Sequence, residues 1–252
     1  MHPVAALGAA ATIVSTAFAL CTLDRFLARR KVHELAWTQS LVMFTLASGA
    51  YWWSAAAGWS AWSFRIFYLF GAILNVPYLA AGTVALLAGP IAGRRVLSTL
   101  HLVAAFCAGA VLLAPLRAPI AHTGLPSGRT IFGPGPRIMA AVGSGLGATV
   151  VLVGAVASVW SLLRGRRSAR LAATNAMIAA GTLVLGIGGA AYTGADAMVA
   201  FGVFLTIGVT MLFVGFLISS SGAIAERRRP ERLSPFFGEL WELANPPAVT
   251  DR

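Results

Sequence analysis

Seven long apolar runs dominate the sequence, and short polar connections separate them. A hydrocarbon core about 30 Å thick needs about 20 residues of helix, and each run is long enough to cross it. The runs do not alternate between apolar and polar positions as the strands of a membrane barrel do. The pattern therefore predicts an all-α, polytopic membrane protein with seven transmembrane helices. We place these spans at 3–23, 35–57, 63–88, 97–115, 138–163, 171–192 and 196–219.

Composition supports the bilayer as the solvent of this chain. Of the 252 residues, 58% are hydrophobic and 11% are charged, whereas a soluble domain carries about 25% charged residues. We expect a transmembrane domain at 1–225 and a cytoplasmic tail at 226–252. The first run is interpreted as a retained span and not as a cleaved signal peptide, because positive charge follows it and does not precede it.

The net charge of +11 is distributed asymmetrically along the chain. Fifteen of the 19 basic residues lie in the tail and in the connections after the first, third and fifth runs. Positively charged connections stay in the cytoplasm, so the N-terminus is expected outside and the C-terminus inside a bacterial plasma membrane. The same placement favours anionic lipid headgroups as partners at the cytoplasmic face and argues against nucleic acid.

The tail is expected to contain a short helix on the membrane surface. Ser234 suits the cap and Pro235 the first position of a helix over 235–243. Its apolar side chains share one face, which predicts a position along the inner interface. Each nearby arginine is expected to gain about 1 kcal/mol from anionic headgroups.

Aromatic, proline and glycine residues mark the outer side. The connection over 116–137 is rich in proline and glycine, which predicts a loop without helix over the outer face. Five aromatic residues near the outer end of the second run are expected to form an interfacial belt. These residues are Tyr51, Trp52, Trp53, Trp59 and Trp62.

The sequence Asn75-Val76-Pro77 in the third run is the main polar feature near the middle of the bilayer. Pro77 removes a backbone hydrogen bond and frees a carbonyl about one turn earlier. With Asn75 and Tyr78, it is expected to offer polar groups to the bundle interior, as in the broken helices of transporters. The scarcity of charge in the spans favours a small neutral or lipophilic ligand. The alternative is a structural kink in which Asn75 bonds a neighbouring helix.

Two further functions remain open at this stage. The last three runs are rich in glycine, including the Gly143 and Gly147 pair of a GxxxG pattern. Such helices pack closely, which allows an accessory subunit of a membrane complex or a homo-oligomer. His33 and His101 lie at similar depth and allow a haem-binding redox site. The sequence contains no recognised catalytic or metal-binding motif, so neither an enzyme nor a bound cofactor is expected.

Residues 64–83, FRIFYLFGAILNVPYLAAGT, resemble a segment of uncharacterised seven-helix membrane proteins of actinobacterial type. That resemblance implies the fold and no activity. The runs are also similar to the 3+1+3 parallel repeat of SWEET sugar transporters, because Phe70-Gly71 in the third run matches Phe201-Gly202 in the seventh. Those transporters use an Asn from helices 3 and 7, so the resemblance implies a pocket at Asn75 and Thr206. They also carry hinge prolines, which this chain lacks inside the corresponding spans.

The same repeat makes Arg65 and Asp196 equivalent positions. Each lies five residues before its Phe-Gly pair, so both are expected at the same depth near the outer surface. An unpaired charge near hydrocarbon is costly, which predicts an ion pair between them. Such a pair is expected to gate access toward Asn75. The alternative is two side chains that snorkel separately into water.

Overall fold

The computed structural model describes residues 3–165, 169–190 and 197–227, and within them the fold is all-helical, without strands. The prediction of an all-α protein is therefore confirmed. Between α2 and α5, three helical segments follow one another without a break and form one rod. The elements are α1 (Pro3–Arg29), α2 (Val32–Ala57), α3 (Ala61–Phe67), the π-helix η1 (Tyr68–Leu74), α4 (Asn75–Leu87), α5 (Pro90–Leu113), α6 (Gly128–Ile131), α7 (Pro134–Leu163), α8 (Ala169–Ala190) and α9 (Ala197–Arg227).

Five helical segments are long and apolar enough to cross a membrane, as expected for a multi-pass membrane protein. α2 has 26 residues, but its polar side chains make it less apolar. In α8, the described apolar stretch is shorter than in these five segments and covers Ala176–Gly188. The five segments are Pro3–Arg29, Ala61–Leu87, Pro90–Leu113, Pro134–Ser161 and Ala197–Ile218.

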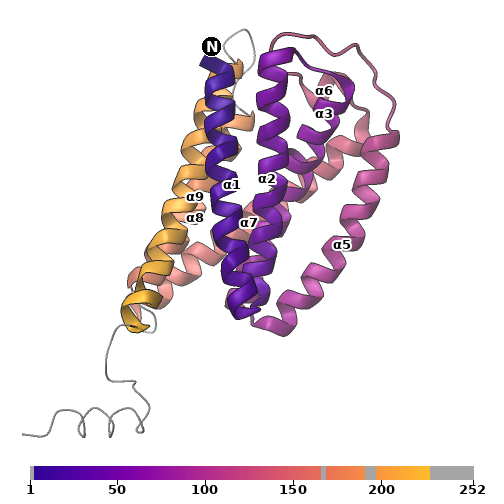
Figure 1. Ribbon diagram of the computed structural model, residues 1–252. Helices are drawn as coiled ribbons and strands as arrows, with labels where there is room; N and C mark the ends of the chain where they lie inside the picture. The colour runs from indigo at the N-terminus through magenta and orange to yellow at the C-terminus, as the bar shows by residue number, and fades with distance from the viewer. Residues whose placement is uncertain (1–2, 166–168, 191–196, 228–252) are drawn as a thin grey trace, which may run out of the picture.

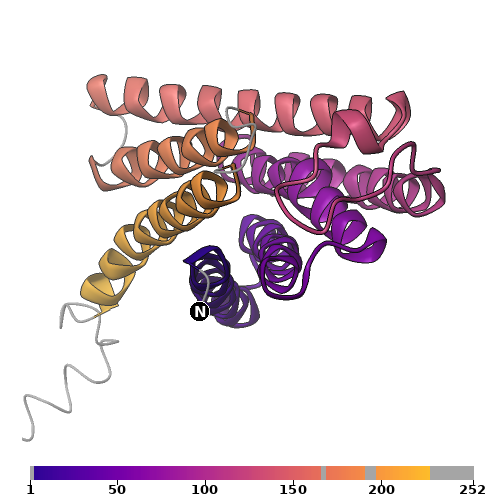
Figure 2. The ribbon, with the colours of Figure 1, turned by 90° about the horizontal axis from the view of Figure 1, so that it is seen from above.

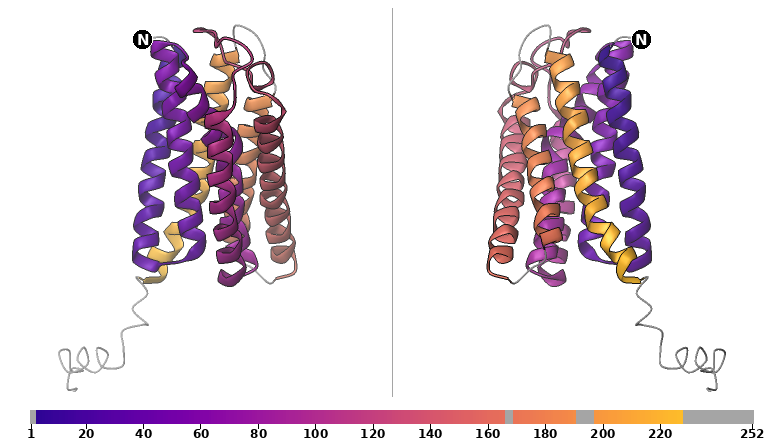
Figure 3. Two further views of the ribbon diagram at one scale, coloured as in Figure 1. Left: turned by 90° about the vertical axis from the view of Figure 1, so that its right-hand side faces the viewer. Right: turned by 90° about the vertical axis from the view of Figure 1, so that its left-hand side faces the viewer.

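Six of the helices form a closed ring. Contacts run from α1 to α2, α4, α7, α8 and α9, and α9 returns to α1. α5 lies outside this ring and packs against α2, α4 and α7. Figures 1 and 3 show the N-terminus at one end of the bundle and the last described turn of α9 at the other. Seen along the bundle, α7, α8 and α9 occupy one side and α1, α2 and α4 the other (Figure 2).

The rod formed by α3, η1 and α4 changes its hydrogen bonding just before Pro77. Proline has no N–H, so the carbonyl of Ile73 loses its helical partner. In the preceding turns, the Asn75 N–H bonds the Phe70 carbonyl, five residues back, which is the π-helical pattern. α7 covers the break: Ser144 Oγ donates to the Ala72 carbonyl at 2.6 Å. The break therefore faces a neighbouring helix and not open space.

Glycines allow α7, α8 and α9 to approach their neighbours closely. A Cβ on Gly143 would lie 2.8 Å from the Ile73 carbonyl oxygen, so only glycine lets α7 cover the break in the rod. A Cβ on Gly181 of α8 would lie 2.9 Å from the Gly208 carbonyl oxygen of α9. The glycine-rich helices thus pack closely as predicted. The helices that meet these glycines belong to the same chain.

The C-terminal end of α2 belongs to the core and not to an interfacial belt. Tyr51 and Trp59 are fully buried, so the belt prediction is wrong for these two residues. The Tyr51 hydroxyl donates to the Met198 carbonyl at 2.6 Å and links α2 to α9. Burial gives these rings the packing that water-facing positions lack. Trp52, Trp53 and Trp62 are exposed and remain suited to a belt.

The long loop lies at the same end of the bundle as the N-terminus (Figure 1). The expectation of no helix over 116–137 is wrong for Gly128–Ile131, which forms the single turn α6, and for residues 134–137, which are the first turn of α7. Ser127 caps this turn, because its side chain accepts a hydrogen bond from the Arg129 N–H. Phe132 is buried and stacks on Phe64, with ring centroids 5.3 Å apart. The loop is thus anchored to α3.

Arg65 holds the C-terminal end of α5. Its guanidinium donates to the carbonyls of Val111, Leu112 and Ala114, with 2.9 Å to Leu112 and 2.8 Å to Ala114. The last carbonyls of a helix have no partner within the helix, so this arginine satisfies the end of α5 from outside. Asp196 lies outside the described residues, so its pairing with Arg65 stays a prediction.

Replacing Arg65 with methionine is expected to release the C-terminal end of α5. The lost charge-assisted hydrogen bonds should cost about 2 kcal/mol locally. Hydrogen–deuterium exchange should rise in the last two turns of α5 and stay unchanged in α2. Arg94→Met is the control, because Arg94 is exposed at the opposite end of α5. Equal exchange in the two variants would contradict the capping role.

Candidate ligand-binding pocket

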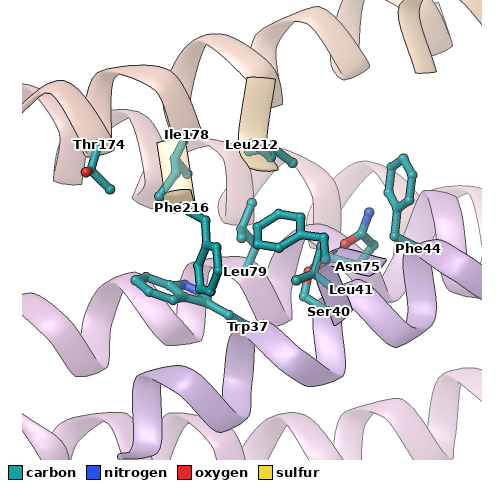
Figure 4. A pocket seen from close by; sticks show the side chains of 11 residues that line it. Trp37, Ser40, Leu41, Phe44, Asn75, Leu79, Thr174, Ile178, Leu212 and Phe216 are labelled. Atoms are coloured by element: carbon teal, nitrogen blue, oxygen red, sulfur yellow. Dashed lines mark hydrogen bonds between the residues drawn. The ribbon is translucent and has the colours of Figure 1, made fainter. Parts of the chain in front are cut away.

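A pocket lies inside the helix ring, between α1, α2, α4, α8 and α9 (Figure 4). The space between its side chains is about 470 Å³, including the part that opens outward. Most of the lining is apolar, and four side chains are aromatic. The lining residues are Phe18, Trp37, Ser40, Leu41, Phe44, Asn75, Leu79, Thr174, Ile178, Leu212 and Phe216.

Helical periodicity explains how separate parts of the sequence reach this pocket. Residues three or four positions apart share one face of a helix. Four residues of α2 follow this spacing over two turns, and α4, α8 and α9 each supply a pair four positions apart. These sets are Trp37, Ser40, Leu41 and Phe44; Asn75 and Leu79; Thr174 and Ile178; and Leu212 and Phe216.

Aromatic rings close most of the pocket. Phe18 of α1 lies 5.0 Å from Phe216 of α9, measured between ring centroids. Trp37 of α2 rests on α4 at Gly82, where a Cβ would overlap the indole nitrogen. Glycine at that position is therefore required for the indole to lie flat against α4. The space left for the centre of a water molecule is about 20 Å³, which is room for about one water. A larger ligand must displace one of these rings.

Two buried polar groups in the pocket have no partner in the described part of the chain. The buried Trp37 Nε1 and Thr174 Oγ1 form no hydrogen bond there. Ser40 Oγ donates to Asn75 Oδ1 at 2.6 Å, which orients the amide. Figure 4 shows the Asn75 nitrogen pointing away from Ser40 toward Phe44, and no hydrogen bond from this nitrogen is found among the described residues. Unpaired buried donors are costly, so they mark a place where a ligand or water is expected.

The structure places the four predicted site residues in different surroundings. Asn75 lines the pocket. Pro77 faces α7 beside Gly147, and Tyr78 lies on the α5 side, 5.6 Å from the His101 ring. Thr206 donates to the Gly202 carbonyl at 2.8 Å within α9 and approaches α1. Only Asn75 of the four therefore reaches the pocket.

The sequence analysis missed three polar pocket residues: Trp37, Ser40 and Thr174. Each lies three or four positions from an apolar pocket residue of the same helix, namely Leu41, Phe44 or Ile178. That spacing was the signal in the sequence that could have indicated a shared helix face. The alternative interpretation of the sequence predicted a hydrogen bond between Asn75 and a neighbouring helix. The hydrogen bond from Ser40 of α2 to Asn75 is such a bond. Asn75 thus combines a structural bond through its oxygen with a free donor on its nitrogen.

The two histidines considered for haem have separate neighbours. The His33 ring meets Trp37 edge to face at 5.3 Å. The Gln39 side-chain amide nitrogen lies 3.0 Å from His101 Nε2 and donates to it, because an amide nitrogen is a donor only. The ring contacts of the described residues include none between the two histidines.

A buried ion pair lies beside the end of the pocket opposite the N-terminus. Glu34 is 1% exposed, and one of its carboxylate oxygens lies 3.2 Å from Arg25 and 3.9 Å from Arg29. The Arg25 guanidinium also lies 4.7 Å from the centroid of Phe216, a pocket wall. The pair thus joins α1, α2 and α9. Nothing in the sequence pattern indicated that Glu34 is buried.

The side chains that line the pocket are uncharged. None of the residues that line it carries a carboxylate, an imidazole or a positive charge. Apolar walls with a few polar groups are typical of sites for small molecules. The sequence matches no protein-family model, and no curated protein is significantly similar to it.

Proposed function

We propose that this protein is an integral membrane protein that binds or transports a small neutral or lipophilic molecule. The observation that carries this proposal is the pocket inside the helix ring, with its aromatic walls and the two buried unpartnered groups Trp37 Nε1 and Thr174 Oγ1. A neutral ligand fits because the lining supplies no charge to balance an ion. A lipophilic ligand fits because most of the wall is hydrocarbon and aromatic ring. No catalytic role is part of this proposal.

The proposal includes seven spans in a bacterial plasma membrane, with the N-terminus outside. The opposite positions of the N-terminus and the end of α9 support an odd number of crossings (Figure 3). Arg94, Arg95 and Arg164 are exposed beside connections that the charge rule assigns to the cytoplasm. These side chains are available to anionic lipid headgroups. The tail helix proposed at 235–243 lies outside the described residues.

A 3+1+3 repeat is also part of the proposal. If α1, α2 and α4 are exchanged with α7, α8 and α9, respectively, each helix–helix contact of the ring becomes another helix–helix contact of the ring. The same exchange leaves α5 unmatched, as expected for a linking helix. Transporters with internal repeats bind substrate where the two halves meet. The pocket draws its walls from both sets of helices, which supports transport by movement of one half against the other.

The accessory-subunit alternative has less support. Its main argument was the glycine-rich surface of α7, α8 and α9. Gly147 and Gly181 contact α4 and α9 of the same chain, so these glycines are already used inside the protein. The haem alternative has less support because His33 and His101 have separate neighbours.

The proposed function predicts that a neutral small molecule co-purifies with the protein. Mass spectrometry of extracts should compare the wild type with Ile178→Phe, which fills the pocket from α8. Ile187→Phe is the matched control, because Ile187 lies on the same helix and is 51% exposed. We expect the molecule in the wild type and the control, and at least about a tenfold loss in Ile178→Phe, which corresponds to about 1.4 kcal/mol.

Two outcomes would contradict the proposed function. One is the absence of any neutral molecule enriched over bulk lipid in the wild type. The other is equal retention by Ile178→Phe and Ile187→Phe, which would place the bound molecule on the outer surface. Circular dichroism should show the same helix content in all three proteins, so that loss of binding is not loss of fold.

A further inference from the structure

We infer that the ligand carries an uncharged oxygen acceptor, such as a ketone or quinone carbonyl, which Trp37 and Asn75 bind inside the pocket. This inference rests on the proposed function and specifies the chemical class of its ligand. It follows from the balance of donors and acceptors among the pocket residues. The shape of the walls adds a second requirement.

The pocket offers donors in excess of acceptors. The indole Nε1–H of Trp37 is a donor only, and it is buried without a partner. The Asn75 oxygen already accepts from Ser40, so its unpaired nitrogen presents two further N–H groups. Thr174 Oγ1 is able to donate as well. A ligand without an acceptor would leave these buried donors unsatisfied, at a cost that disfavours its binding.

We take the acceptor to be uncharged because, among the described residues, the arginine that contacts the pocket wall is already paired with a carboxylate. The nearest arginine in contact with the lining is Arg25, which bonds Glu34 at 3.2 Å. The Phe216 ring lies under that guanidinium and is itself a pocket wall. A carboxylate or phosphate in the pocket would be desolvated without a paired charge. A carbonyl oxygen accepts the same hydrogen bonds at much lower desolvation cost.

The walls favour a flat apolar body around that oxygen. Phe18, Phe44 and Phe216 contribute three aromatic rings besides the Trp37 indole. Planar rings stack offset or edge to face on such side chains. Figure 4 shows the nitrogen edge of Trp37 turned toward Leu79 and the Asn75 nitrogen farther along the pocket. A flat carbonyl compound lying between the rings meets one of these donors at its edge.

The test compares two probes that differ only in the acceptor. Fluorenone and fluorene have the same planar ring system, and only fluorenone has a carbonyl group. Their binding to the full-length protein in lipid nanodiscs is measured by equilibrium dialysis, with empty nanodiscs as the reference. We expect the wild type to bind fluorenone about tenfold more tightly than fluorene, beyond the difference in lipid partition.

Two variants assign the preference to the pocket. Trp37→Phe keeps an aromatic ring and removes the N–H, so the preference for fluorenone should fall to within about twofold. Trp62→Phe is the control, because Trp62 lies on α3, is 66% exposed and does not line the pocket. This control should keep the tenfold preference.

The possible results separate the inference from the function. Specific but equal binding of both probes overturns the acceptor requirement and leaves a lipophilic site in place; a structural water would then satisfy the donors. A preference that survives in Trp37→Phe overturns the role of Trp37. Specific binding of neither probe contradicts both the inference and the proposed pocket.

Discussion

Replacing Glu34 with alanine is expected to lower the free energy of unfolding by about 3 kcal/mol. The carboxylate is 1% exposed and lies between Arg25 and Arg29. Its removal leaves two partly buried guanidinium groups without a counter-charge, and the loss of one partner of a buried pair is more costly than the loss of both. The apparent Tm in detergent should fall by about 8 °C on this basis.

Asp24→Asn is the control for this prediction. Asp24 is an exposed carboxylate on α1, next to Arg25 in sequence, and its loss should change the Tm by less than about 2 °C. The double variant Arg25→Met/Glu34→Met should recover part of the stability, because it removes charge and counter-charge together. A Glu34→Ala protein as stable as Asp24→Asn would show that the ion pair does not hold α1 and α2 together.

Replacing Gly147 with leucine is expected to disrupt the seam between α4 and α7 and to cost about 3 kcal/mol. A Cβ at this position would lie 2.9 Å from the backbone nitrogen of Pro77 and 2.9 Å from the carbonyl carbon of Val76. These are backbone atoms, so no side-chain rotation relieves the overlap. α7 must move away from the broken rod, which also weakens the bond from Ser144 to the Ala72 carbonyl.

Gly145→Leu provides the matched control on the same helix. Gly145 is exposed, and a Cβ added there meets no atom within 4 Å. Thermal unfolding should therefore separate the two variants, with Gly145→Leu close to the wild type. Similar losses in both would indicate that α7 tolerates leucine equally on both faces, against the packing described here.

Apolar length predicts the helices of this chain well, because a membrane span needs little more than enough apolar residues in a row. The third run was expected at 63–88, and the continuous rod covers Ala61–Leu87. Hydropathy does not reveal which helices touch. Nothing in the sequence shows that α5 stands outside the ring, because its residues are as apolar as those of α4, which lies in the ring.

The pocket was predicted only through Asn75, because a lone amide in an apolar run is conspicuous. Trp37 and Thr174 resemble ordinary interfacial or helix-bonded residues until the helices are assembled. Thr206 was chosen by analogy between two runs, and its helical phase explains why it misses the pocket. It precedes Leu212 by six residues, a rotation of about 240° around α9, which turns it toward α1.

The loop and Arg65 show that the sequence pattern does not reveal which groups a residue contacts. Proline and glycine correctly indicate a connection after α5, although α7 already begins at Pro134, and they do not reveal that Phe132 anchors this connection to Phe64. Depth alone suggested an acidic partner for Arg65. The end of α5 supplies carbonyl acceptors at hydrogen-bonding distance, and unpaired helix-end carbonyls are equally good partners for a guanidinium.

The central claim is that the helix ring encloses a site for a lipophilic ligand. The most direct test is an experimental structure of the full-length protein in lipid nanodiscs, purified without an added ligand. We predict non-protein density larger than a water between Trp37, Asn75 and Thr174, with one edge within hydrogen-bonding distance of the Trp37 nitrogen. A pocket that the aromatic rings fill completely, or that holds a single water, would contradict the claim.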